Sequence, residues 1–306
     1  MPELIQLSQF WLAVEDIPVK RTGLALALGL ALTFGLSGCG GEPPPDEGAS
    51  SKPLHRLLPE HIRKSGQLKI GGSTNVAPYL YRDGADVVGF EKDLMDELGE
   101  VLGVDVELYD AGFAALVPGL QSGKFDVAMG DFTDTLERQQ AVSFVDYTTS
   151  YQSLFVQNGN PKGLRTADDL CGATAAATVG SLSAQLAEEQ NASCRKDGKA
   201  GLKVLAMENN AASMMQVRTG RADTVVIDYV IGRYVEANSE AGQVAGRPFH
   251  RQFHGAAVRK DNRRLRTALT AAFEEIMRNG SYKRILHKHD MSRLAMDAPL
   301  VNAATS

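Results

Sequence analysis

The sequence predicts an α/β protein made of two similar lobes. Predicted strands alternate with predicted helices over residues 68–131, and the same order of elements recurs over residues 166–228. A short motif stands at the matching place in each repeat, GKFDVAMGD at 123–131 and GRADTVVID at 220–228. Each copy has Gly, a basic residue, Asp, an apolar run and a closing Asp at the same spacing. Because strands that alternate with helices favour parallel pairing, we interpret the repeat as an internal duplication of a small α/β lobe.

The first repeat is predicted to begin with a strand and to continue with two helices and two further strands. The longer helix, GFEKDLMDELGEVLG, spaces Phe90, Leu94 and Leu98 for one apolar face, as in a helix packed on a sheet. The shorter helix ends at Gly123. In chain order the elements are a strand at 68–73, a helix at 89–103, a strand at 104–110, a helix at 113–123 and a strand at 125–131.

The second repeat opens with a helix-start signal, because Thr166 and Asp169 have the spacing of a capping box. The remaining elements follow the order of the first repeat. They are a strand at 172–178, a helix at 181–190, a strand at 202–207, a helix at 211–220 and a strand at 224–228.

The rest of the chain is predicted to return to the first lobe through a strand at 255–260. A helical region at 261–286 follows, with a stop at Gly280 and apolar residues spaced for one buried face at Leu265, Leu269, Phe273 and Ile276. The chain then crosses between lobes near 154–157 and 252–256, and two crossings make a hinge. We therefore expect lobe I at 56–154 and 256–296, lobe II at 155–255, and a disordered tail at 297–306.

The closing aspartates of the repeated motif are candidate functional residues. In open α/β sheets, ligands bind beyond the carboxyl ends of the strands, where Asp131 and Asp228 are predicted to lie. If the lobes face each other, both carboxylates point into one cleft. Asp126 and Asp223 stand at the opposite strand ends, where we expect them to cap the preceding turns.

The N-terminal segment has the layout of an export signal. Lys20 and Arg21 precede an apolar run at 23–36, which is shorter than the roughly 20 residues of a membrane-spanning helix. The run ends in LSGC at 36–39, which resembles a bacterial lipobox, so residues 1–38 are interpreted as a lipoprotein signal peptide and Cys39 as the lipidated residue. The alternative is a buried helix that happens to end in a cysteine.

The segment that follows Cys39 is predicted to be a flexible tether at 39–55. It has almost no apolar side chains to bury, and it contains a run of three prolines. A lipid anchor with such a spacer would hold the folded part at the outer face of the cell membrane.

The two other cysteines, Cys171 and Cys194, suggest a disulfide in an exported protein. Closing that loop would stabilise the fold by roughly 3 kcal/mol. A catalytic thiol is the alternative, but no histidine lies near either cysteine in the sequence.

Composition argues against nucleic-acid binding. The chain has a net charge of −5, 43% hydrophobic and 23% charged residues, and its basic residues are scattered. A nucleic-acid-binding surface normally requires clustered Lys and Arg.

Several motifs together resemble one protein family. They run from about Arg56 to Met296, and they are LKIG (68–71), APY (77–79), GFEKDL (89–94), LVPGLQSGKFDV (116–127), TDTLER (133–138), SFVDY (143–147), GRADTVVID (220–228) and GSYKRIL (280–286). The chain resembles the polar amino-acid-binding group of bacterial extracellular solute-binding proteins, the capture subunits of ABC importers. The resemblance implies a two-lobed, type II periplasmic-binding-protein-like fold with a two-stranded hinge, which closes on a free amino acid.

The resemblance implies that Arg138 clamps the ligand α-carboxylate, for which a planar guanidinium suits two parallel hydrogen bonds. Without the motif, Arg138 would be read as a surface residue that pairs with Glu137 or Asp134. The resemblance also implies that Asp228 neutralises the α-ammonium; the alternative is a plain helix cap. The other implied ligand-binding residues are Thr133, Thr178 and Ser181 at the carboxylate and Phe113 under the aliphatic part, although Phe113 also suits a core position.

The chain departs from the family pattern in the loop after the first strand, where Ser73 and Val76 replace an acid and an aromatic residue. The missing acid weakens the case for a basic ligand side chain, and the missing aromatic widens the pocket. Asp131 replaces a small residue, so its carboxylate could meet the ammonium or a donor on the ligand side chain, or repel acidic ligands. We therefore place neutral polar or small amino acids ahead of Glu and Asp.

An enzyme of the dehydratase type on the same fold is one alternative. No HExxH, GxSxG or paired-Cys spacing occurs, and none of the histidines coincides with the predicted cleft floor. His250 and His254, four residues apart near the second crossing, are expected to have a surface or hinge role. We therefore expect no catalysis, no cofactor and no metal.

An extracellular sensor domain is the other alternative, but it would require a spanning helix and a cytoplasmic domain, neither of which the sequence shows after Leu286. We expect a monomeric, lipid-anchored, extracytoplasmic receptor that passes its amino acid to a permease and its ATPase.

Overall fold

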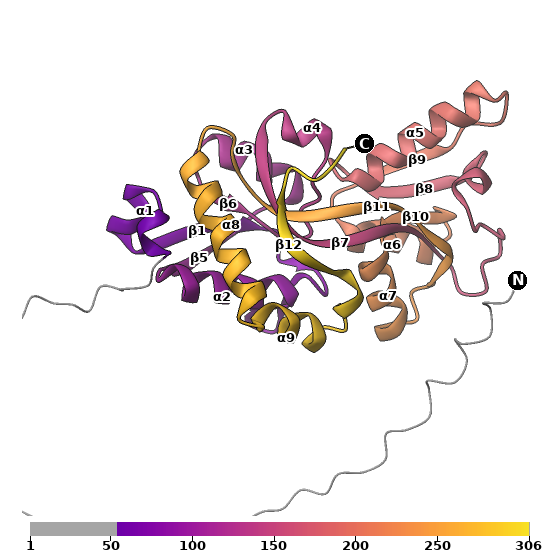
Figure 1. The fold of residues 1–306 in the computed structure, drawn as a ribbon. Coiled ribbons are helices and arrows are strands. Elements are labelled where there is room, and N and C mark those ends of the chain that lie inside the picture. Colours follow the sequence, from indigo (N-terminus) through magenta and orange to yellow (C-terminus); the bar gives the residue numbers. More distant parts are fainter. Residues whose placement is uncertain (1–53, 306) are drawn as a thin grey trace, which may run out of the picture. The chain divides into compact units, whose positions relative to one another are not determined.

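The computed structural model describes residues 54–305 (Figure 1). The predicted signal peptide at 1–38, the lipidation site Cys39 and the tether up to residue 53 lie outside the described residues. The last two residues of the predicted tether are part of the fold, because Leu54 packs against the core and His55 begins a 3-10 helix, η1 (His55–Leu57).

The described chain alternates strands and helices, as predicted. The strands are β1 (Gln67–Gly72), β2 (Asn75–Val76), β3 (Leu80–Asp83), β4 (Asp86–Val88), β5 (Asp105–Asp110), β6 (Val127–Ala128), β7 (Val142–Val156), β8 (Thr174–Thr178), β9 (Lys203–Met207), β10 (Thr224–Asp228), β11 (Gln243–Arg259) and β12 (Ala295–Val301). The helices after η1 are α1 (Glu60–Ser65), α2 (Phe90–Leu102), η2 (Phe113–Ala115), α3 (Leu116–Gln121), α4 (Leu136–Gln139), η3 (Ala167–Leu170), α5 (Leu182–Lys196), α6 (Asn210–Arg218), α7 (Tyr229–Asn238), α8 (Arg263–Arg278), α9 (Ser281–Lys288) and η4 (Ser292–Leu294).

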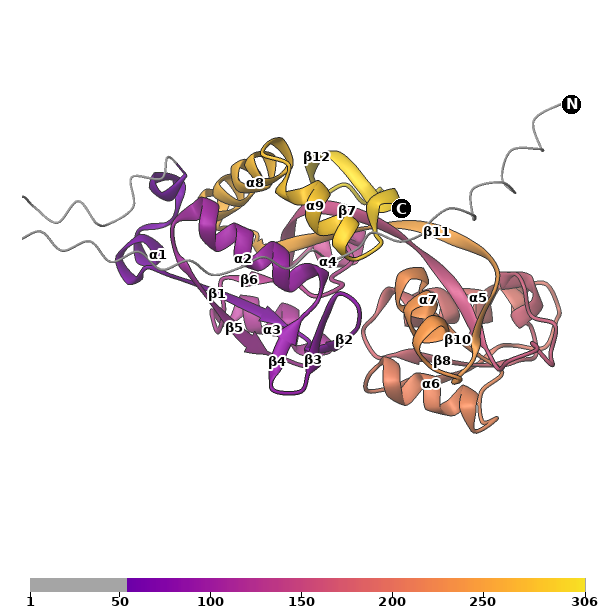
Figure 2. The same cartoon turned by 90° about the horizontal axis from the view of Figure 1, so that it is seen from below.

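Two long strands join the lobes. Within the described residues the main sheet has the order β5-β1-β6-β11-β7-β10-β8-β9, and β2, β3 and β4 form a small separate sheet. β7 and β11 pair antiparallel along most of their length and run from one group of elements to the other (Figure 2). Below, lobe I denotes the elements around β1, β5 and β6, and lobe II those around β8, β9 and β10. The two-lobed α/β fold with a two-stranded hinge is therefore confirmed.

The first crossing between lobes lies earlier than the predicted 154–157. Asp146 and Thr148 pair with β12 on the lobe I side, whereas Gln152–Val156 already pair with β10 of lobe II. The crossing thus falls at residues 149–151, whose partners in β11 are residues 251–253. The strand β7 continues through both lobes without a break, so the sequence contains no turn that marks the boundary.

Each lobe buries both faces of its strands. In lobe I, Val145 and Val258 face the core cluster that contains α2, α8 and α9, whereas Phe144 and Ala257 face α3. In lobe II, α5 lies on one side of the strands and α6 and α7 on the other (Figure 1). Accordingly, every residue of the strand TVVID is buried, as expected for a strand covered on both sides.

The repeated motif corresponds to a repeated contact. The backbone N–H of Asp126 donates to the carbonyl of Lys69 at 2.8 Å, and its side chain accepts from the N–H of Lys69 at 3.1 Å. Asp223 makes the same pair of bonds with Thr174, at 2.7 and 2.9 Å. Each aspartate thus ties the start of its strand to the neighbouring strand. This is a structural role, although the partner is a strand rather than the turn that was expected.

Several predicted elements differ in the structure, and the strand predicted at 255–260 is the end of the longer strand β11. The strand predicted at 125–131 is only β6, since the chain turns at Gly130 and Asp131, which have φ values of 111° and 56°. The predicted final helix is two helices, α8 and α9, separated at Gly280 as its stop signal indicated.

The prediction of a disordered tail at 297–306 is wrong for the described residues. Residues up to Val301 form β12, which pairs antiparallel with β7. The backbone N–H groups of Ala303 and Ala304 then donate to the carboxylates of Asp146 and Asp134, at 2.9 and 3.0 Å. The half of β7 that β10 does not cover thus gains a partner for its backbone hydrogen bonds.

Candidate functional site between the lobes

Asp228 lies at the carboxyl end of β10, as the sequence predicts, and it also caps α7. Its Oδ1 accepts from the backbone N–H groups of Val230 and Ile231 at 2.8 and 3.3 Å and from the Tyr79 hydroxyl at 3.2 Å. Its Oδ2 accepts from Nε2 of Gln252 at 2.7 Å. The side chain is 3% exposed, and burial raises its pKa to about 6 against the lowering effect of these hydrogen bonds. The helix cap that the sequence offered as the alternative for Asp228 is therefore present in the structure.

A tight turn after β6 sets the direction of the Asp131 side chain. The chain leaves β6 and adopts a positive φ at Asp131, a conformation that Asp tolerates better than most residues. Glu91, fully buried at the start of α2, holds this turn: its carboxylate accepts the N–H of Asp131 at 2.9 Å and also that of Gly130. Burial, followed by the negative charge of Asp228, raises the pKa of Asp131 well above its ordinary value. Burial raises the pKa of Glu91 to about 7.

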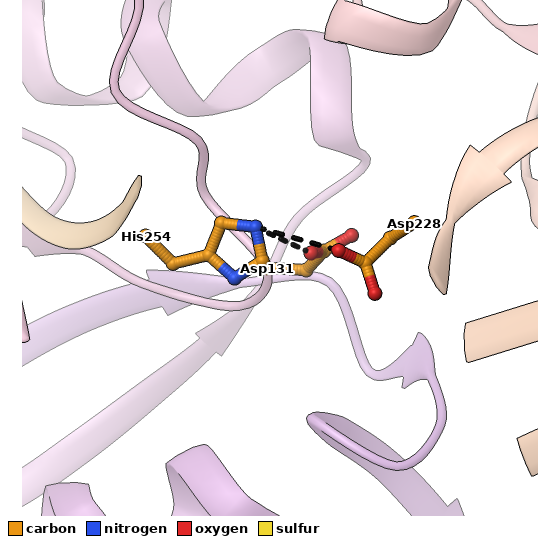
Figure 3. Close-up of side chains that lie close together, drawn as sticks. All are labelled: Asp131, Asp228 and His254. Carbon is orange, nitrogen blue, oxygen red and sulfur yellow. Dashed lines mark ion pairs between the residues drawn. The ribbon is translucent and has the colours of Figure 1, made fainter. Parts of the chain in front are cut away.

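His254 completes a cluster with the two aspartates. It lies in β11 and is fully buried, with Nε2 3.3 Å from Oδ1 of Asp131 and 3.7 Å from Oδ2 of Asp228 (Figure 3). The ring of Tyr79 packs edge-on against the imidazole at 5.2 Å between centroids. Burial, with the charge of Arg138 as a second cause, lowers the pKa of His254 to about 3, so the imidazole is neutral at neutral pH.

A chain of side-chain hydrogen bonds fixes the orientation of the groups around His254. Ser183 donates to Oε1 of Gln152 at 2.8 Å, Gln152 donates to Oε1 of Gln252 at 2.7 Å, and Gln252 donates to Asp228. Because an ionised carboxylate only accepts, Gln252 must present its amide nitrogen to Asp228. The same nitrogen lies 2.9 Å from Nε2 of His254. Nε2 therefore accepts from Gln252, which leaves the proton on Nδ1, a buried nitrogen that has no hydrogen-bond partner among the described residues.

A cavity of about 70 Å³ lies between the lobes at this cluster. All of the predicted ligand-binding residues except Arg138 line it. From lobe I these are Ser73, Phe113, Asp131 and Thr133, and from lobe II they are Thr178, Ser181 and Asp228. The charged residues that line it are Asp131, Asp228 and Glu208, with no Lys or Arg among them. The central cavity is therefore acidic.

Arg138 lies beside the central cavity rather than on its wall. Its Nη1 donates to the carbonyl of Thr133 at 2.6 Å, and its Nη2 donates across the lobes to the carbonyl of Gly180 at 2.8 Å. The guanidinium stacks against the rings of Phe113 and Phe132, at 5.1 and 4.6 Å from their centroids. Burial lowers its pKa to about 10. It lines an adjoining cavity that shares Ser181 and Leu182 with the central one.

The hydroxyl groups on the lobe II side are held by local bonds. Ser181 caps α5 by accepting from the N–H of Ala184 at 3.2 Å, and it donates to the carbonyl of Thr178 at 2.7 Å. Thr178 donates to Oδ1 of Asn210 at 2.8 Å. The start of α5 therefore faces the cavity, where the positive end of a helix favours an anion.

On the lobe I side, Ser73 donates to Oδ1 of Asn75 at 3.1 Å. Both residues line the cavity.

Five buried polar groups at this site were not predicted from the sequence: His254, Gln152, Gln252, Tyr79 and Glu91. The surface role expected for His254 is wrong, since the side chain is fully buried and faces both aspartates. Its place in β11, directly after the crossing at residues 251–253, agrees with the expected hinge position. His250, by contrast, is half-buried with a φ of 45° and borders a cavity beside α5 and the C-terminal residues. The only sequence signal was the pair of histidines at the second crossing.

One group of side chains within residues 54–305 has the composition of a metal centre. One ligand atom each from Asp131, Asp228 and His254 lie within 4.8 Å of one another. No spacing in the sequence relates these three residues, because they come from lobe I, lobe II and the hinge strand.

The pairing of Cys171 and Cys194 is present in the structure, with Cα atoms 5.5 Å apart. Among residues 54–305, no helix has the length and apolar character needed to cross a membrane.

Comparison with known proteins agrees with this geometry. Residues 68–291 match the bacterial extracellular solute-binding proteins, family 3. The arginine-binding protein ArgT of Corynebacterium glutamicum is 23% identical over 81% of this chain and 82% of its own length. The L-cystine-binding protein TcyJ of Escherichia coli K12 is 26% identical over 74% of this chain and 84% of its own.

A solved structure gives the same result. The crystal structure of an ancestral amino acid-binding protein, described as a precursor of cyclohexadienyl dehydratase, is 29% identical with a TM-score of 0.68. The match covers 76% of this chain and 98% of the other. The chain belongs to the bacterial extracellular solute-binding proteins of family 3.

Proposed function

We propose that the chain captures a free amino acid with a neutral or cationic side chain between its lobes and delivers it to the permease of an ABC importer. The observation that carries the proposal is the placement of Asp131 and Asp228, which come from opposite lobes and face one acidic cavity. An ammonium group in this cavity would be neutralised by both, and burying it without such a counter-charge would be costly. The similar proteins named above for binding arginine, cystine or amino acids support this ligand class.

The α-carboxylate would lie on the side of the cavity next to Arg138. There the start of α5 offers backbone N–H groups, and Ser181 borders both cavities. Arg138 would exchange its bond to the Gly180 carbonyl for bonds to the carboxylate, which are stronger because both partners are charged.

The ligand side chain would extend over Phe113 towards Glu208, which lines the cavity from lobe II. This acid compensates for the one that is missing at Ser73. Three carboxylates without a lining cation would repel glutamate and aspartate, so cationic side chains are accepted along with the neutral ones favoured by the sequence.

Hinge closure follows from the same contacts. A ligand held by Asp131 in lobe I and Asp228 in lobe II binds more tightly to the shut state, and it therefore shifts the population towards closure. The closed receptor is the form that the permease and its ATPase would recognise.

A thermal-shift screen of the purified protein against the amino acids tests the proposal. Arginine, lysine, ornithine, cystine and neutral polar amino acids form one panel, and glutamate and aspartate form the other. A saturable rise in melting temperature with a member of the first panel supports the proposal. No rise with any member, or a rise with glutamate or aspartate alone, would contradict it.

A dehydratase is the second candidate function. It is favoured by the burial of Asp131, which raises the pKa of this carboxyl above its ordinary value as in a general acid, and by the description of the similar ancestral protein. We propose binding without turnover. Incubation of the protein with each ligand from the screen, followed by proton NMR, distinguishes binding from turnover. A dehydratase would accumulate a product formed from the ligand by loss of one water molecule.

We further propose that Cys39 carries a lipid that anchors the protein outside the cell membrane. Cys39→Ser should release the protein from the membrane fraction of the producing cells. Retention of the variant in that fraction would contradict the proposed lipid anchor. It would not bear on the proposed ligand binding.

A further inference from the structure

We propose that Asp131, Asp228 and His254 form a binding site for a divalent transition-metal ion of the size of Zn²⁺. The site rests on these three side chains, and because Asp131 and Asp228 also face the proposed ammonium position, the metal ion and the ammonium would compete for them. It would link the lobes, because Asp131 belongs to lobe I, Asp228 to lobe II and His254 to the hinge strand β11 (Figure 3).

The spacing of the three ligand atoms fits a tetrahedral ion. Zinc binds His nitrogen and carboxylate oxygen at about 2.0–2.2 Å, which places neighbouring ligand atoms about 3.4 Å apart. Nε2 of His254 lies 3.3 Å from Oδ1 of Asp131 and 3.7 Å from Oδ2 of Asp228. All three atoms lie within 4.8 Å of one another. A small closing movement of the lobes would bring the oxygens of Asp131 and Asp228 to the separation that a tetrahedral ion requires.

The protonation of the cluster leaves an unmatched oxygen that a cation would satisfy. Nε2 of His254 faces the amide nitrogen of Gln252, so it carries a lone pair and no proton to donate to Asp131. Among the described residues, Oδ1 of Asp131 is buried and has no hydrogen-bond partner. When Asp131 is ionised, two lone pairs thus face each other at 3.3 Å, and a metal ion between them would bind both.

The neutral state of His254 and the charge of the cluster also suit a metal. A metal ion binds the unprotonated imidazole nitrogen, and Nε2 of His254 faces the amide donor of Gln252 with its lone pair. Arg138, the nearest guanidinium, is bonded to the carbonyls of Thr133 and Gly180 rather than to either aspartate. A divalent ion would therefore offset two buried carboxylates that have no ion-pair partner among the described Lys and Arg residues.

The coordination would be completed from the cavity. Three protein ligands leave a fourth position for water or a ligand atom, as in open zinc sites. Around the ligands, Tyr79 and Gln252 orient Asp228, and Glu91 holds the backbone at Asp131. Such outer contacts are the usual support of metal ligands.

Titration of the tag-free purified protein with Zn²⁺ in a calorimeter, without amino acids, tests the site. We expect one saturable site in the unaltered protein. Asp131→Asn keeps the shape of the side chain. Because Oδ1 of Asp131 has no hydrogen-bond partner to lose in the described part of the chain, the fold should persist. Because changes around a metal ligand already weaken binding about 10–100-fold, loss of the ligand itself should weaken it by more than about 100-fold.

Two further measurements locate the ion. Co²⁺ should give visible absorption bands typical of a tetrahedral site in the unaltered protein, and these should be lost in Asp131→Asn and His254→Gln. His61→Gln is the matched control, because His61 pairs with Asp126 at 3.0 Å on the exposed far end of lobe I. No saturable binding, unchanged binding in Asp131→Asn, or loss of binding in His61→Gln would overturn the proposal. None of these results depends on which amino acid the protein captures.

Discussion

Arg138 of lobe I donates a hydrogen bond to the carbonyl oxygen of Gly180 in lobe II at 2.8 Å. The same guanidinium bonds to Thr133 and lies against two phenylalanine rings, so its position is fixed before any ligand arrives. A side chain with a fixed planar fork loses little freedom when it takes up a carboxylate. This arrangement makes Arg138 the most informative residue to change.

Arg138→Ala should abolish the rise in melting temperature caused by the ligand found in the thermal-shift screen. Arg138→Lys should keep the charge but weaken binding about 10–150-fold, since hydrogen bonds to charged groups contribute about 1.5–3 kcal/mol. Calorimetry measures both. Arg278→Ala, which removes an exposed arginine paired with Glu275, is the control and should bind normally. Normal affinity in Arg138→Ala would remove Arg138 from the site.

Asp228→Asn separates the two roles of Asp228. Asn is as good a helix cap as Asp, so α7 should persist. The amide nitrogen would face the donor of Gln252, so the melting temperature of the free protein should fall, and affinity is compared under conditions where both proteins are folded. The loss of the buried negative charge should lower ligand affinity at least about 10-fold, because the ammonium loses its counter-charge. A matched variant is Asp223→Asn, since Asp223 has the same place in its motif but lies at the other end of the strand. If both variants bind equally well, Asp228 does not hold the ammonium.

Asp126→Ala and Asp223→Ala should lower stability without changing ligand affinity. Each change leaves a backbone N–H, of Lys69 or of Thr174, without its carboxylate acceptor. The expected loss is about 1–3 kcal/mol of unfolding free energy in each case. Urea denaturation measures it, and ligand titration of the same variants should give unaltered affinity. An affinity loss comparable to that of Asp228→Asn would show that these aspartates reach the site.

Removal of the bond between Cys171 and Cys194 should destabilise lobe II. The two residues are separated by 23 positions, and a loop of that size corresponds to about 3 kcal/mol in the chain-entropy description. The variant with both cysteines changed to serine should therefore unfold at lower urea concentration than the unaltered protein. The unaltered protein with reductant should match the variant. Identical curves with and without reductant would argue against the bond.

Stability should fall as pH rises towards about 8, in part because of Asp146. Burial, followed by the negative charge of Asp134, raises the pKa of Asp146 to about 8. Between the unfolded value near 4 and this value, the folded protein binds more protons than the unfolded chain. The contribution is therefore fully present at low pH and is lost as pH rises through the folded pKa.

Asp146→Asn tests this contribution, because asparagine resembles the protonated acid and cannot ionise. The difference in unfolding free energy between variant and unaltered protein should move in favour of the variant from pH 5 to pH 9. Denaturation at several pH values measures the difference. A difference that is constant with pH would contradict the raised pKa.

Much of the fold could be predicted from the sequence because it depends on local patterns. The apolar run of TVVID, the helix spacing of Leu265 and Phe273, and the stop at Gly280 each reflect burial or backbone conformation within a few residues. The place of Asp228 followed from the same logic, since a strand that ends in Asp before a helix puts the carboxylate at the sheet edge. The repeated motif predicted two equivalent lobes for the same reason.

The tertiary structure alone decided which polar groups share the cavity. His254 reaches Asp131 and Asp228 because β11 runs antiparallel to β7 through the hinge, and strand register is set by contacts far apart in the sequence. The brevity of β6 depends on Glu91, which holds the turn from a helix outside the motif. The strand β12 forms because half of β7 has an open edge, which no property of residues 295–301 alone reveals. Local sequence thus determined the elements and their ends, whereas packing between distant segments determined the charges that face one another.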